Sequence, residues 1–198
     1  MPRKNRVWLP GAIYHITCRG IRRTVLFHDD CDREMYLLLL QTAMKRFQFR
    51  LHAYCLMPNH IHMQLESGDD PPCKILQYMN SVYAIYFNKK YQHSGHVFEK
   101  RFYAVLVEGR KYELELSRYI HLNPVKAGLT DTLDEYVWSS YPTYSTAHHS
   151  PFVTTRRLLS YFKNPHKENY LKFIAKQLTN PQRKTKTAQV KKSPVRLQ

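Results

Sequence analysis

Two histidines separated by one residue are the feature of this sequence best suited to chemistry. His60, Ile61 and His62 open a stretch in which polar and apolar residues alternate as far as Leu65. This alternation predicts a β-strand with both imidazoles on one face, roughly 6–7 Å apart. Two imidazoles at this spacing can bind one divalent metal ion. Taken alone, however, such a pair is more often a polar strand face in contact with water.

Tyr119 and Asn123 could complete such a site, because they are four residues apart on a predicted helix over residues 110–122 and so share one of its faces. We expect this helix to end before Pro124, since the residue before a proline disfavours helical geometry. If the face meets the histidines, Asn123 offers a carbonyl oxygen as third ligand. Tyr119 then places its hydroxyl beside an ion that can polarise a phosphodiester. The alternative is that Tyr119 only packs on the sheet.

The elements that must position these residues follow a β-α-β-β-α-β order. The predicted strands and helices, in chain order, are residues 12–18, 29–47, 49–57, 60–66, 73–91 and 102–107. The strands on either side of Pro58 and Asn59 form a hairpin. The pattern predicts an α+β fold: a ferredoxin-like four-stranded antiparallel sheet with two covering helices, to which the tyrosine-bearing helix is added.

The chain beyond Gly128 has a weaker pattern. Short helices are predicted at residues 131–136, 156–162 and 167–178. We therefore divide the chain into a catalytic domain at residues 1–145, a small helical extension at 146–180 and a disordered basic tail at 181–198.

The charge of the chain indicates a nucleic-acid partner. The formal net charge is +16 and the isoelectric point is near 9.8, while residues 181–198 carry only six of the basic side chains, with no acid. The rest of the chain is therefore basic as well. Basic residues in two predicted loops are candidates for DNA backbone contacts, although the first loop could equally be a solvated turn. They are Arg19, Arg22, Arg23, Lys100 and Arg101.

Several other classes of protein are disfavoured. No run of apolar residues reaches the length needed to cross a membrane, and the basic N-terminus is not followed by an apolar signal core. We expect a cytoplasmic protein without a membrane partner. The four cysteines contain no C-x-x-C pair, which argues against a zinc ribbon and a redox dithiol.

Three segments together resemble the IS200-like tyrosine transposases with an HUH motif, and most of all the branch associated with repetitive extragenic palindromes (REP). The segments are residues 58–62, 95–102 and 119–129. The resemblance covers about residues 8–145. It implies a nuclease domain that needs Mg²⁺ or Mn²⁺ and that cleaves and transfers single-stranded DNA at or near a hairpin through a 5′-phosphotyrosine. This REP-associated branch also implies a monomer.

By position, the resemblance implies that His60, His62 and Asn123 are the metal ligands and that Tyr119 is the nucleophile. The insertion-sequence enzymes have glutamine at the position of Asn123. Two other interpretations stay open at this point. A non-catalytic module that binds structured nucleic acid would need no metal, and a hydrolase that activates water would leave no covalent intermediate.

Overall fold

The chain folds around a four-stranded antiparallel sheet in the order β2-β3-β1-β4. The computed structural model describes residues 8–147 and 150–178, so the predicted tail at 181–198 lies outside the described residues. The strands are β1 (Ile13–Arg19), β2 (Phe49–Met57), β3 (His60–Ser67) and β4 (Tyr103–Val107). The predicted ferredoxin-like α+β fold is confirmed.

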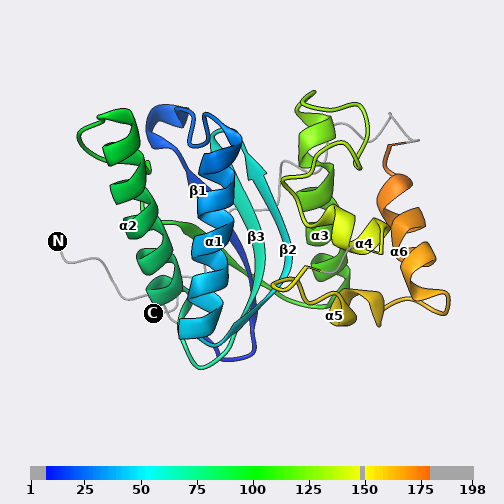
Figure 1. Ribbon diagram of the computed structural model, residues 1–198. Coiled ribbons are helices and arrows are strands. Elements are labelled where there is room, and N and C mark those ends of the chain that lie inside the picture. Colours follow the sequence, from blue (N-terminus) through cyan, green and yellow to red (C-terminus); the bar gives the residue numbers. More distant parts are fainter. Residues whose placement is uncertain (1–7, 148–149, 179–198) are drawn as a thin grey trace.

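Two helices cover one face of the sheet (Figure 1). The helix α1 (Asp30–Arg46) begins at Asp29, whose carboxylate accepts a hydrogen bond from the backbone of Asp32 in a reciprocal cap. The helix α2 (Pro72–Tyr91) has a proline in its first turn. The main core lies between these helices and the sheet. Its fully buried members include Ile16, Leu40, Leu51, Ile61, Met63, Met79 and Tyr83.

The opposite face of the sheet is covered by α3 (Arg110–Lys126), which carries Tyr119. Leu116 and Ile120 of α3 pack against Ala53 and Cys55 of β2 in a second apolar cluster. The short helices α4 (Tyr141–Ser145), α5 (Arg156–Leu159) and α6 (His166–Ala175) lie beyond α3, on the side away from α1 and α2 (Figure 1). The helices α5 and α6 are shorter than the helices predicted at residues 156–162 and 167–178.

The prediction that Pro124 ends the tyrosine-bearing helix is wrong. The helix continues to Lys126 with Pro124 inside it. Leu122 and Pro124 are both buried, and the backbone N–H of Ala127 still donates to the carbonyl of Asn123 at 2.9 Å. Burial of these side chains therefore outweighs the local preference against a helix before proline.

The predicted short helix at residues 131–136 is also absent. This segment forms turns, in which the Glu135 carboxylate accepts hydrogen bonds from the backbone N–H groups of Asp131 and Thr132 at 3.0 and 3.3 Å. A side chain that satisfies these backbone donors competes with helical pairing. Among all the residues described, no helix has the length and apolar character needed to cross a membrane.

Candidate metal and tyrosine site

The two histidines of β3 lie on the face of the sheet that α3 covers. Their ring centroids are 4.8 Å apart and the rings are nearly perpendicular, at 87°. In the sheet, Thr17 of β1 and Cys55 of β2 flank His62, whereas Arg19 and Met57 flank His60. His62 is buried and His60 is half-buried. The predicted arrangement of both imidazoles on one face is confirmed.

Tyr119 of α3 reaches this histidine face. Its ring centroid lies 5.3 Å from that of His62, in an edge-to-face contact. Leu116 and Ile120, on the neighbouring stripe of α3, hold the helix against the sheet. The structure thus brings the phenol of Tyr119 to the histidine face, although His60 and His62 lie about sixty residues earlier in the sequence.

Asn123 lies one helical turn beyond Tyr119 on the same side of α3. Its Nδ2 donates to the carbonyl of Tyr119 at 2.9 Å, so the amide oxygen Oδ1 remains available as an acceptor. No hydrogen bond joins Asn123 to His60 or His62 in the part of the chain that the structure describes.

Sequence reasoning missed His15, which is also part of this site. Its Nε2 lies 3.0 Å from Nδ1 of His62, and its ring centroid lies 5.9 Å from that of Tyr119. Thr17 Oγ1 lies 3.3 Å from His62 Nδ1 and 3.4 Å from His15 Nε2. Alternation in β1 could have placed His15 and Thr17 on one strand face, but the register that sets them beside His62 is not visible in the sequence.

The environment keeps all three imidazoles neutral at neutral pH. Burial lowers the pKa of His15 to about 4. Burial, with a smaller contribution from the Arg19 charge, also lowers the pKa of His60 to about 4. Burial, and then the neighbouring His15, His60 and Arg19, hold the pKa of His62 well below its ordinary value. A neutral imidazole is the form that binds a metal ion.

The candidate metal donors in this region are the neutral imidazoles of His60 and His62 and the side-chain amide of Asn123. No group of three or more His, Cys, Asp or Glu side chains that could hold a metal is present among the described residues. The amide oxygen of Asn123 is a neutral donor on the helix that carries Tyr119. Such a set is compatible with a divalent ion that keeps open positions for substrate oxygens.

Of the five basic candidates, Arg19 is the last residue of β1 and pairs with His60, and the other four lie in two segments that touch each other next to it. An isolated bridge pairs Gly20 with Phe98, and the backbone N–H of Glu99 donates to the carbonyl of Arg19 at 2.9 Å. Gly20 is required here, because a Cβ atom at this position would lie 2.2 Å from the carbonyl oxygen of Thr24. All five basic side chains are exposed: Arg19, Arg22, Arg23, Lys100 and Arg101.

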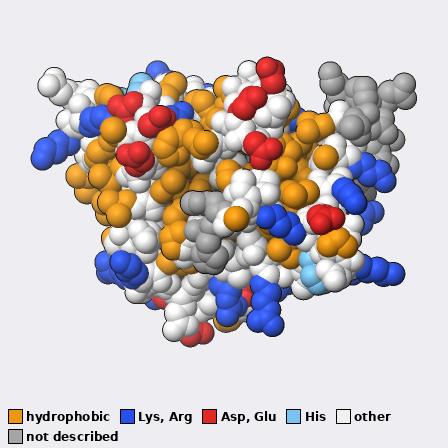
Figure 2. All heavy atoms as spheres, turned by 45° about the vertical axis from the view of Figure 1, so that its right-hand side comes forward, with side chains coloured by type: hydrophobic (Ala, Val, Ile, Leu, Met, Phe, Trp, Pro, Cys, Tyr) orange, Lys and Arg blue, Asp and Glu red, His pale blue; other side chains and the backbone are white. Residues whose placement is uncertain are grey.

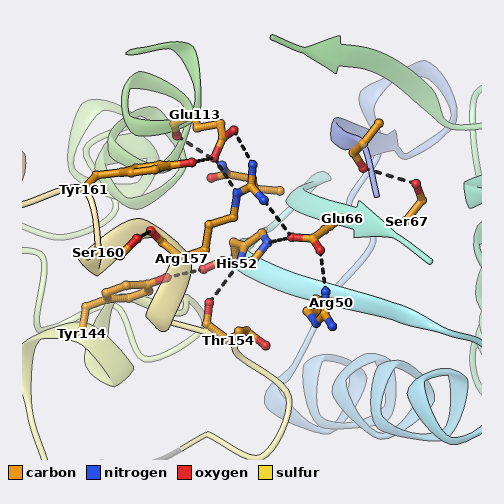
Figure 3. A network of polar contacts seen from close by, with 12 residues as sticks. Arg50, His52, Glu66, Ser67, Glu113, Tyr144, Thr154, Arg157, Ser160 and Tyr161 are labelled. Atoms are coloured by element: carbon orange, nitrogen blue, oxygen red, sulfur yellow. Dashed lines mark hydrogen bonds and ion pairs between the residues drawn. The ribbon is translucent and has the colours of Figure 1, made fainter. Parts of the chain in front are cut away.

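A partly buried ion-pair network holds the first half of α3 to the sheet and to α5 (Figure 3). Arg157 donates two hydrogen bonds of 2.8 Å to the carboxylate of Glu113 and reaches Glu66 of β3 at 3.4 Å. Gln64 of β3 also donates to the carbonyl of Glu113, at 3.2 Å. We call Glu66, Glu113 and Arg157 the α3 clamp. Glu113 lies six residues before Tyr119, so the clamp positions the helix that carries the tyrosine.

Charged side chains are unevenly distributed on the face of the molecule near α4 and α6. Lys and Arg side chains follow its lower and right-hand parts, whereas Asp and Glu side chains gather mainly towards the top (Figure 2). The basic character predicted from composition is therefore also present on the folded part of the chain.

A ferredoxin-like sheet with a tyrosine helix against two histidines, next to basic segments, is the arrangement expected of a tyrosine-dependent DNA-processing enzyme. The chain belongs to the family of IS200-like transposases, whose family model matches residues 9–123. The predicted membership of this family is thereby confirmed.

Individual relatives agree with this assignment. A protein of Haemophilus influenzae that carries the name REP-associated tyrosine transposase is 29% identical over 153 residues, which are 71% of this chain and 86% of that protein. The solved structure of a REP-associated tyrosine transposase bound to a REP hairpin superposes with a TM-score of 0.64 at 18% identity. The match covers 78% of this chain and 91% of the other and supports the shared fold.

Proposed function

We propose that this protein is a metal-dependent endonuclease and strand transferase that acts on single-stranded DNA at hairpins of the REP type. The observation that carries the proposal is the edge-to-face contact of Tyr119 with His62, at 5.3 Å between ring centroids, within a single chain. Tyr119 is half-buried, and its ring contacts the neutral imidazoles of His62 and His15.

In this proposal, His60, His62 and Asn123 hold Mg²⁺ or Mn²⁺. The bound ion would polarise the scissile phosphate and neutralise the charge that develops on its oxygens. The low imidazole pKa values keep the ligand nitrogens unprotonated.

Tyr119 is the nucleophile in the proposed reaction. Its hydroxyl oxygen gives up its proton and forms a bond to phosphorus, while the bond from phosphorus to the 3′ oxygen breaks. The departing 3′ oxygen takes up a proton, and the 5′ phosphate stays attached to Tyr119 as a phosphotyrosine. Attack by a second 3′ hydroxyl on this phosphotyrosine reverses the chemistry and completes strand transfer.

The exposed basic loops supply the DNA affinity. Arg19 pairs with His60 in the sheet, and the other exposed basic side chains lie on the two segments that meet next to it, where they would contact the phosphate backbone: Arg22, Arg23, Lys100 and Arg101. The hairpin preference is proposed by analogy with the REP-associated relative that was solved with its hairpin. Because histidines and tyrosine meet within one chain, we propose that the protein acts as a monomer. The cytoplasmic location stays a prediction.

Incubation with a labelled single-stranded hairpin and Mn²⁺ tests the proposal. We expect a covalent protein–DNA band on a denaturing gel, which Tyr119→Phe abolishes. Tyr112→Phe is the matched control, because Tyr112 lies on the same helix and is also half-buried. Cleavage without a covalent band would indicate a hydrolase that activates water. Metal-independent binding without cleavage would indicate a binding module.

A further inference from the structure

We propose that Asn59 and His15 are positioning residues that direct the Nε2 atoms of His60 and His62 towards the metal. The inference rests on the proposed function, since it concerns the same metal site. It assigns a task to two side chains that would otherwise be only a turn residue and a buried polar residue. Metal-binding histidines need a partner on the second ring nitrogen, which sets the tautomer and the ring orientation.

The orientation of the Asn59 amide follows from a backbone contact. Its Nδ2 donates to the carbonyl of Arg23 at 3.2 Å. The Oδ1 atom is therefore the one that faces His60, at 2.6 Å from Nδ1. A carbonyl oxygen can only accept a hydrogen bond, so Nδ1 of His60 must carry the proton. The neutral imidazole then has its lone pair on Nε2.

The Arg23 carbonyl that orients Asn59 belongs to an unusual loop. Arg22 and Arg23 have left-handed backbone angles, with φ of 49° and 64°, which non-glycine residues seldom adopt. This conformation turns the chain back after Gly20 and brings the carbonyl of Arg23 to the β2–β3 turn. The loop that presents basic side chains thus also supports the first histidine of the site.

His15 has the same relation to the second histidine. Its Nε2 lies 3.0 Å from Nδ1 of His62, and the two rings are stacked with an interplanar angle of 28°. If His62 binds the metal through Nε2, its Nδ1 carries the proton and donates a hydrogen bond to Nε2 of His15. Thr17 Oγ1, at 3.3 Å from the same Nδ1 atom, is the only other polar side-chain atom near it in the part of the chain described.

Both histidines therefore have the same arrangement. In each, Nδ1 is engaged by a neighbouring side chain, and no hydrogen bond to Nε2 is present among the described residues. The geometry defines an Nε2,Nε2 pair that is organised before any metal binds.

Nitrogen-15 NMR of the metal-free protein, with labelled histidine, tests the tautomers directly. We expect His60 to be in the form with a proton on Nδ1 and to become a mixture of tautomers in Asn59→Ala. The signal of His60 is assigned by its loss in His60→Gln. A His60 that carries its proton on Nε2 in the wild-type protein would overturn the inference.

Mn²⁺ binding, followed by the electron paramagnetic resonance of free manganese, tests the consequence. Asn59→Ala and His15→Ala should each weaken binding about tenfold or more. His15→Gln should recover part of the loss, because glutamine can place an acceptor where Nε2 lies. Asn88→Ala, on the helix α2 that covers the opposite face of the sheet, is the matched control and should bind as the wild type does.

The outcomes separate this inference from the proposed function. Tight Mn²⁺ binding by the wild type with unchanged affinity in Asn59→Ala and His15→Ala would overturn the inference and leave the proposed function standing. Absence of Mn²⁺ binding by the wild type would overturn both.

Discussion

Replacement of Arg157 by glutamine should destabilise the protein strongly, although Arg157 is far from Tyr119 in sequence and belongs to a four-residue helix. Arg157 is the cation that the two buried carboxylates of the α3 clamp share. Its side chain is 38% exposed, whereas those of Glu113 and Glu66 are only 6% and 10% exposed. Removal of the arginine therefore leaves Glu113 buried with a charge that, among the described residues, keeps a hydrogen bond from the Tyr161 hydroxyl alone, at 2.7 Å.

The expected loss of stability depends on the contacts that each carboxylate keeps after Arg157 is replaced. Breaking a buried ion pair by removal of one partner typically costs about 3–5 kcal/mol. Solvent around Arg157 reduces this value, and Glu66 keeps its contacts with Arg50 and His52 at 2.6 and 2.9 Å. We therefore expect Arg157→Gln to lower the free energy of unfolding by roughly 2–3 kcal/mol, which corresponds to a decrease in Tm of about 5–10 °C.

Urea denaturation followed by circular dichroism measures this change. Arg156→Gln is the matched control, since Arg156 precedes Arg157 on the same helix and is exposed. We expect it to change the free energy of unfolding by less than about 0.5 kcal/mol. In the double variant Arg157→Gln with Glu113→Gln, part of the lost stability should return, because the unpaired charge is removed. If Arg157→Gln is no more destabilising than Arg156→Gln, the clamp does not hold α3.

Three further predictions concern pH, the basic loop and DNA binding. Burial opposes ionisation of Glu66 and Glu113, but hydrogen bonds from His52 and Arg50, and from Arg157 and Tyr161, outweigh it and leave both pKa values below the ordinary range. The clamp therefore stabilises the fold fully above the unfolded-state pKa of about 4.3. This stabilisation is lost as the pH falls through the lower pKa values of the folded protein. The urea midpoint should therefore fall on acidification, and it should fall less in Glu113→Gln. Gly20→Ala should lower the free energy of unfolding by about 1–3 kcal/mol in the same denaturation assay, because the new methyl group would lie 2.2 Å from the Thr24 carbonyl oxygen. An unchanged urea midpoint would contradict the tight packing of this loop. Arg22→Gln should reduce the slope of the logarithm of DNA affinity against the logarithm of salt concentration by about 0.7, as expected for one lost phosphate contact on a single strand; an unchanged slope in fluorescence-anisotropy titrations would remove Arg22 from the interface.

The sequence was sufficient to predict the sheet because its signals are local. Alternation after His60, the turn at Pro58 and Asn59 and the cap at Asp29 each depend on residues close together in the chain. The strands β2 and β3 form the predicted antiparallel hairpin, and Tyr119 lies on the helical face that meets His62.

Features that depend on distant pairing could not be predicted. His15 joins the site only because the register of β1 against β3 sets Thr17 opposite His62. Arg157 meets Glu113 across 44 residues, and no local pattern indicates this contact. The helix continues past Pro124 because the surrounding side chains bury that residue, which is a property of packing rather than of local preference.

The most direct test of the central claim is to locate the DNA attachment by mass spectrometry. The protein is incubated with a hairpin and Mn²⁺ and then digested with protease and nuclease, and the nucleotide-bearing peptide is sequenced. The account predicts one adduct, on Tyr119, that disappears when His60 and His62 are both replaced by alanine. An adduct on another residue, or one that persists without both histidines, would contradict the assignment of this site.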